Sequence, residues 1–135
     1  MRIKFIMNKL GRLLEKIKSN THSYIHLHGS SCDLPSEYTK CKSWIEYYSS
    51  QKWGIVPKVC PCCKTKPSEE NPFVGGHVVR VIEGKPIDTN VYITPICDRC
   101  NKEAKIESAF SILDLYVVKH PDPATCLKNI NVNES

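Results

Sequence analysis

The chain has 135 residues, of which 41% are hydrophobic and 8% aromatic, so it is long enough for one domain with a modest core. No stretch approaches the ~18 consecutive apolar residues of a membrane span, so no membrane-spanning helix is expected. The net charge of +5 permits a polyanionic partner but does not by itself establish one.

Cysteine is abundant, with eight residues, and in a secreted chain of this size it would predict disulfides. Residues 1–18 carry Lys and Arg between their apolar positions and so lack the continuous apolar run of a secretory signal. We therefore expect a reducing, cytoplasmic location, where paired cysteines hold metal.

Residues 1–20 are predicted to form a basic amphipathic helix. Apolar side chains recur there at helical spacing: Ile3, Ile6, Met7, Leu10, Leu13, Leu14 and Ile17. Such a helix can contact nucleic acid, a membrane surface or a protein partner, including a second copy of the chain, or it can cover the core of its own domain.

Residues 21–57 are predicted to be a loop followed by a short helix that packs on the core. Residues 19–39 are polar and rich in turn formers, and His26, His28 and Cys32 within them are either a second metal site or ordinary loop residues. The helix is expected over residues 40–50, and helical spacing places four side chains on its buried face: Cys41, Trp44, Ile45 and Tyr48.

Two C-x-x-C pairs, separated by about thirty residues, are the strongest signal in the chain. Cys60 and Cys63 form the first pair, and Cys97 and Cys100 form the second. Each pair can occupy a tight turn that directs both sulfurs to one side, and two such turns can surround one Zn²⁺ tetrahedrally. Cys62 is also available, but the single residue between it and Cys60 aims their sulfurs poorly. Two disulfides are the alternative.

Between and after these pairs the pattern predicts strands and a second helix. Phe73–Val74 and Val78–Ile82 are expected to be extended, with a turn at 83–86, and residues 91–96 form a strand that ends at Pro95 or lies at an edge there. A helix is expected from Asp98, as N-cap, to Glu107. A final strand is expected at 115–118, followed by a polar tail at 121–135 in which Cys126 has no obvious partner.

The order of knuckle, hairpin, knuckle and helix over residues 58–120 is that of a treble clef, and it resembles the HNH family of His-Me finger nucleases. With the helix that contains Ser43 and Trp44, the resemblance covers residues ~25 to 120. The Gly75-Gly76-His77-Val78 element and the stretch from Tyr92 to Asn101 are similar to elements of small bacterial HNH-like proteins. The predicted fold class is therefore α+β: a small zinc-stabilised treble clef, with a ββα-metal-like hairpin and helix, preceded by N-terminal helices.

In HNH enzymes, the resemblance implies, a strand histidine takes a proton from water while one divalent cation, Mg²⁺ or Mn²⁺, binds the scissile phosphate. His77 matches the general base, and Asn101 matches the last position of the motif, which contributes to metal binding. The position before the histidine, usually a metal ligand, is Gly76. The middle asparagine of the motif is replaced by Tyr92, and Asn90 is the candidate substitute.

Basic residues cluster in sequence around the two knuckles and the second helix, where they could contact phosphates: Lys64, Lys66, Arg80, Arg99, Lys102 and Lys105. Two hypotheses follow. In the first, the chain is an HNH-like protein that binds nucleic acid, with DNA favoured, and is potentially an endonuclease with His77 as base. In the second, it is a non-catalytic, zinc-stabilised protein-interaction module with a degenerate HNH site.

Overall fold

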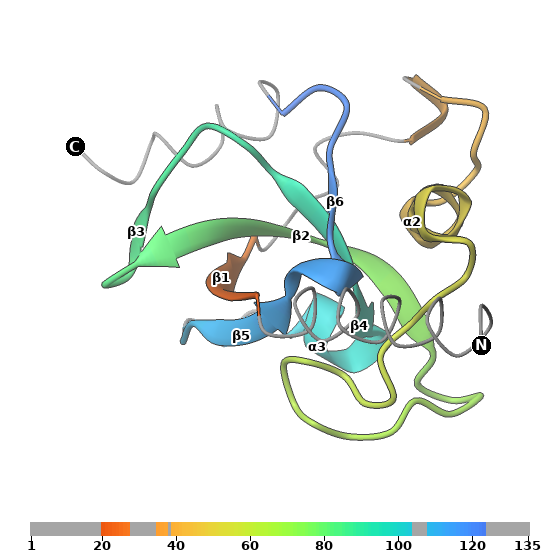
Figure 1. Ribbon diagram of the computed structural model, residues 1–135. Helices are drawn as coiled ribbons and strands as arrows, with labels where there is room; N and C mark the ends of the chain where they lie inside the picture. The colour runs from red at the N-terminus through yellow and green to blue at the C-terminus, as the bar shows by residue number, and fades with distance from the viewer. Residues whose placement is uncertain (1–19, 28–34, 38, 104–107, 124–135) are drawn as a thin grey trace, which may run out of the picture.

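The computed structural model describes residues 20–27, 35–37, 39–103 and 108–123, which form a mainly antiparallel sheet with few, short helices (Figure 1). The fold is therefore mixed α and β, as the sequence predicts. The strands are β1 (Thr21–His26), β2 (Phe73–Ile82), β3 (Lys85–Pro86), β4 (Tyr92–Cys97), β5 (Phe110–Leu113) and β6 (Val118–Lys119). The helices are α2 (Trp44–Lys52) and α3 (Asp98–Lys102), with single 3-10 turns at Pro35–Glu37 and Asp114–Tyr116.

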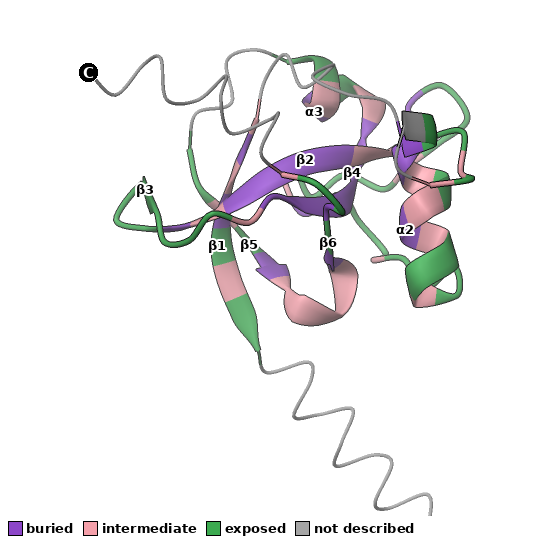
Figure 2. Ribbon diagram, turned by 90° about the horizontal axis from the view of Figure 1, so that it is seen from above, coloured by how far each residue is buried: buried purple, intermediate pink, exposed green. Residues whose placement is uncertain are grey.

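Strand β2 is the axis of the sheet, whose strands lie in the order β5-β1-β2-β4-β6. The first half of β2 pairs with β4, from Phe73 opposite Cys97 to Val78 opposite Tyr92. Its second half pairs with β1 on the other side, while β3 extends the sheet at its far end. The centre of β2 is buried (Figure 2). Every described strand pairing is antiparallel.

The two faces of the sheet carry separate apolar clusters. One face is covered by Tyr24, Val78, Tyr92, Ile112 and Val117. On the other face, α2 packs Trp44 and Tyr48 against Ile93 and Val118. Because successive side chains of a strand point to opposite faces, this division decides which candidate site residues can meet.

Helix α2 begins and ends with well-defined caps. The Ser43 hydroxyl accepts a hydrogen bond from the Glu46 amide, and the Glu46 carboxylate accepts one from the Lys42 amide. The first bond satisfies an amide that has no partner within the first helical turn, and the second ties the residue before the N-cap to the helix. The prediction of a helix here is confirmed, although it starts at Trp44 rather than at residue 40. Trp44 and Tyr48 are buried as predicted, whereas Cys41 and Ile45 are half-buried.

Gly75 and Gly76 are needed because both faces of β2 are approached closely at this point. A Cβ on Gly75 would lie 2.5 Å from the carbonyl carbon of Trp44, so the start of α2 rests directly on the strand. A Cβ on Gly76, on the opposite face, would lie 2.5 Å from Cδ1 of Ile96. These glycines provide packing space, and β2 runs through them without a break, which corrects the prediction of two separate extended segments.

Other expectations are corrected as well. Residues 21–26 form strand β1 inside the sheet rather than a loop, with Tyr24 and His26 buried on one face and Ile25 half-buried on the other. The expected strand at 115–118 is divided between a 3-10 turn at Asp114–Tyr116 and β6. Pro95 is buried in the middle of β4, which continues to Cys97, so the strand does not end at the proline. Because β6 pairs only with Tyr92 and Ile93, Pro95 has a strand on one side alone within the described residues, which confirms the alternative of an edge position.

The predicted helix at residues 1–20 lies outside the described residues except at position 20, and so does the tail from residue 124 onward. No helix among the described residues has both the length and the apolar character that crossing a membrane requires.

We predict that Gly75→Ala destabilises the protein more than Gly76→Ala does. The alanine methyl at 75 meets backbone atoms of Trp44 and Ile45, which cannot move without displacing α2, whereas at 76 it meets the flexible end of Ile96. We expect losses of about 3 kcal/mol and about 1–2 kcal/mol in the free energy of unfolding. Urea denaturation of both variants measures this, and equal losses would contradict the packing described here.

Candidate metal centre

The first cysteine pair lies in a tight turn at the end of a long irregular segment. The Lys64 amide donates to the Cys60 carbonyl at 2.8 Å, and the Cys60 amide donates to the Thr65 carbonyl at 2.9 Å. Lys64 adopts a left-handed conformation, with φ of 63°, which lets the chain reverse direction immediately after Cys63. Cys60 is fully buried and Cys63 is exposed, so one edge of the cluster faces solvent.

The second pair is held by regular structure. Cys97 is the last residue of β4, and Cys100 lies in the first turn of α3; both are buried. The Cys97 sulfur accepts a hydrogen bond from the Cys100 amide and caps α3, which corrects the expectation that Asp98 is the N-cap. Helix α3 ends at Lys102 and is followed by an extended Glu103. The prediction of a helix that continues to Glu107 is therefore wrong at residue 103.

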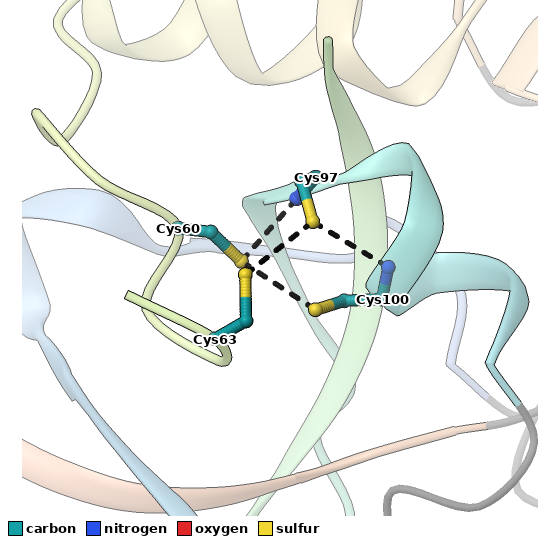
Figure 3. Close-up of side chains that lie close together, drawn as sticks. All are labelled: Cys60, Cys63, Cys97 and Cys100. Carbon is teal, nitrogen blue, oxygen red and sulfur yellow. Dashed lines mark hydrogen bonds between the residues drawn. The ribbon is translucent and has the colours of Figure 1, made fainter. Parts of the chain in front are cut away.

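The four sulfurs converge on one point (Figure 3). Cys60 and Cys100 have their sulfurs 3.9 Å apart, Cys63 and Cys97 have theirs 3.7 Å apart, and all four sulfurs lie within 4.8 Å of one another. A tetrahedral site with Zn–S bonds of about 2.3 Å has sulfur–sulfur edges of about 3.8 Å. These separations exclude disulfide bonds, which need about 2.05 Å. The residues present therefore fit a metal ion that prefers thiolates, such as Zn²⁺.

The four thiols are not equivalent. Burial alone would raise the pKa of Cys63, but hydrogen bonds from the Thr65 side chain and backbone and from neighbouring thiols lower this pKa to about 6. Burial raises the pKa of Cys60. Burial and hydrogen bonds to the neighbouring thiols likewise raise the pKa of Cys100. Of Cys60, Cys63 and Cys100, Cys63 thus ionises most readily. A bound dication would favour the thiolate form of its ligands by offsetting their charge.

The remaining cysteines lie outside this tetrahedron. Cys62 is half-buried and packs beside the cluster, but its sulfur does not belong to the group of four. Burial raises its pKa, which opposes ionisation. Cys41 is half-buried just before α2, while Cys32 and Cys126 lie outside the described residues. Among the described residues, the group formed by Cys60, Cys63, Cys97 and Cys100 is the one cluster suited to a metal.

His77, the candidate base, is buried on the face of β2 that α2 covers, with 2% of its surface exposed. Its ring lies 5.1 Å from that of Trp44 and 5.4 Å from that of His120, measured between ring centroids. His120, which sequence reasoning missed, is also buried, and its Nδ1 accepts a hydrogen bond from the Asp122 amide. The position of His77 is therefore inside an aromatic cluster.

Asn101 lies on the other face of β2. Its side-chain oxygen is 3.6 Å from the Cβ position of Gly76 and 3.0 Å from Nε2 of His26. The register of β1, with His26 opposite Val78, also places His26 on the face away from His77. The structure therefore brings Asn101 together with His26 and keeps both apart from His77. His26 belongs to a strand rather than to a loop site, and His28 and Cys32 lie outside the described residues.

Asn90 is remote from the other two candidates. It lies in a turn before β4, where its backbone N–H donates to the Asp88 carboxylate. The predicted position of Asn90 on a strand face is therefore not observed. Asn101 follows β4 at its opposite end, and a strand of this length spans on the order of 20 Å. The structure thus does not assemble His77, Asn90 and Asn101 into one site, and their catalytic roles remain predictions.

The basic residues fall into two groups. Arg80 interacts with neighbouring side chains on one face of the sheet. Its Nε donates to the Tyr24 hydroxyl at 2.8 Å, and its guanidinium pairs with Asp114 at 3.3 Å. The guanidinium carbon also lies 4.4 Å from the centroid of the Tyr92 ring. The second group is exposed beside the cysteine cluster and consists of Lys64, Lys66, Arg99 and Lys102, of which Lys102 pairs with Asp98 at 2.8 Å. Lys105 lies outside the described residues.

Comparison of the chain with protein-family models, with curated proteins and with solved structures finds no match.

We predict that the purified protein carries one Zn²⁺ per chain and that the Cys60→Ser variant loses it. Serine does not supply a thiolate, and three remaining thiols hold zinc less tightly. Because structural zinc contributes directly to folding, we expect the melting temperature to fall by more than about 10 °C. Metal analysis and thermal denaturation measure both effects.

Cys62→Ser is the matched control, because Cys62 lies in the same turn but outside the tetrahedron. It should keep full zinc content and nearly the wild-type melting temperature. Loss of zinc in Cys62→Ser together with retention in Cys60→Ser would show that the ligand set is different.

Proposed function

We propose that the chain is a zinc-stabilised nucleic-acid-binding protein with a treble-clef core of the His-Me finger type. The observation that carries this proposal is the position of exposed cations directly beside the metal ligands. Lys58 precedes Cys60 by two residues, Lys64 follows Cys63, and Arg99 lies between the cysteines of the second pair. Closing the cysteine cluster therefore gathers positive charge from two distant parts of the chain onto one surface.

Phosphate contacts are the interaction that such a surface suits best. Lys58, Lys64, Lys66 and Arg99 are all exposed, and among the described residues no ion pair involves any of them. A dianionic tetrathiolate–zinc centre, with a charge of about −2, would offset part of this positive charge locally. The side chains nevertheless extend into solvent, where phosphates can reach them.

Binding without hydrolysis is the form of the proposal that the geometry favours. A general base must come within hydrogen-bond distance of the attacking water and of the scissile phosphate. His77 is buried between Trp44 and His120, and Asn101 lies on the opposite face of β2. In addition, Ile96 fills the space next to Gly76, where the family usually places a metal-ligating side chain.

We predict that the protein binds DNA in a strongly salt-dependent manner. With about three to five phosphate contacts, affinity should fall by more than about tenfold between about 50 and 200 mM salt. Replacing Lys64 and Lys66 together by Glu should weaken binding and flatten the salt dependence. Fluorescence anisotropy with a labelled duplex and a labelled single strand measures this.

Replacing Lys85 and Lys119 together by Glu provides the charge-matched control, because both are exposed and lie in β3 and β6, away from the cysteine cluster. The affinity of this variant should remain near that of the wild type. If the zinc-loaded wild type binds neither DNA nor RNA, the nucleic-acid proposal fails, and the protein-interaction hypothesis is favoured.

Nuclease activity is tested separately by incubating supercoiled plasmid with the zinc-loaded protein and Mg²⁺ or Mn²⁺. We expect no nicking, because His77 is not accessible to substrate. Metal-dependent nicking that is lost in His77→Gln, with zinc content unchanged, would contradict this expectation and support the endonuclease hypothesis.

A further inference from the structure

Trp53 is the most exposed large hydrophobic residue among those described, with 88% of its surface accessible. It caps the C-terminus of α2 in a left-handed conformation, with φ of 53° and ψ of 36°. Glycine usually occupies such a position, and for a bulky residue this conformation is uncommon and costs free energy. Neither packing nor backbone preference therefore accounts for a tryptophan here.

The backbone that presents Trp53 is firmly held. The Gly54 amide donates to the Ser49 carbonyl at 3.1 Å, and the Ile55 amide donates to the Lys52 carbonyl at 3.0 Å. The hydroxyl of Tyr48, a fully buried residue, donates to the Ile55 carbonyl at 2.7 Å. The indole thus projects from a backbone that is bonded both to α2 and to the core.

The segment that carries Trp53 is positively charged. Residues 51–67 contain four lysines and neither Asp nor Glu. Lys52 directly precedes Trp53, and Lys58 is exposed five residues after it. Ile55 and Val56, between these lysines, are exposed as well. An aromatic ring within an acid-free basic segment is complementary to a ligand with both flat apolar surfaces and negative charge.

We propose that Trp53 is a stacking platform for an unpaired base of single-stranded nucleic acid, with Lys52 and Lys58 contacting the flanking phosphates. This inference rests on the proposed nucleic-acid-binding function and specifies the class of ligand. In a duplex the faces of the bases are already covered by their neighbours, whereas in a single strand a base can turn onto an exposed indole. The cysteine cluster, which closes the same segment at Cys60, connects this platform to the basic surface around the metal.

The test is an affinity comparison with a labelled oligo(dT) 12-mer and a duplex of equal length. Trp53→Ala should weaken single-strand binding by about tenfold or more, and Trp53→Phe should retain most of it. Duplex affinity should change little in either variant. Ile82→Ala is the control, because Ile82 is also exposed (65%) but lies on β2 away from the lysine segment. Zinc content and circular dichroism confirm that each variant is folded.

Intrinsic fluorescence provides an independent readout, because the chain has only two tryptophans and Trp44 is buried. Oligo(dT) should quench the wild-type emission, and Trp53→Phe, which retains Trp44 alone, should show no quenching.

Three results would overturn the inference. Equal single-strand affinity in wild type and Trp53→Ala would show that Trp53 does not stack on a base, while leaving the nucleic-acid proposal in place. A wild type that binds no nucleic acid would overturn both. Concentration-dependent dimerisation of the wild type that is lost in Trp53→Ala, without an effect on DNA binding, would assign the surface to self-association instead.

Discussion

The convergence of four thiols is the constraint on which the rest of the structure depends. Between the end of α2 and the start of β2, residues 53–72 contain neither helix nor strand. Irregular segments of this length are uncommon in small domains, since their ordering costs conformational entropy that few apolar contacts offset. A metal bound by Cys60 and Cys63 on this segment, and by Cys97 and Cys100 on the sheet, would supply the missing stabilisation. The same closure determines which charged side chains share a surface.

The sheet separates two sets of residues that a linear motif places side by side. His77 and Gly76 are neighbours in sequence, yet one faces the aromatic cluster beneath α2 and the other faces Ile96 and Asn101. Both glycines before His77 are closely packed: Gly75 against the backbone of Trp44 and Ile45, and Gly76 against the side chain of Ile96. His77 therefore contributes to the core beneath α2.

The sequence predicts the parts of the structure that depend on local spacing. The four ligands, the helix containing Trp44 and Tyr48, and the strand leading into Cys97 follow from cysteine spacing and apolar periodicity. Strand β1 could not be predicted in this way, because its stability comes from pairing on both sides by β2 and β5, which are far away in sequence.

The environments of individual side chains were the least predictable feature. Arg80 resembles any surface cation in sequence, but the folded chain surrounds it with Tyr24, Tyr92 and Asp114. Likewise, the contact between His26 and Asn101 joins residues 75 positions apart. Such contacts depend on strand register, which a single sequence with few apolar alternations does not specify.

Zinc K-edge X-ray absorption spectroscopy of the purified protein tests the central claim most directly. The geometry predicts a single shell of four sulfur ligands at about 2.3 Å, with no nitrogen or oxygen ligand. A shell that contains imidazole nitrogen or oxygen, or fewer than four sulfurs, would contradict the tetrathiolate centre and the arrangement of the chain around it.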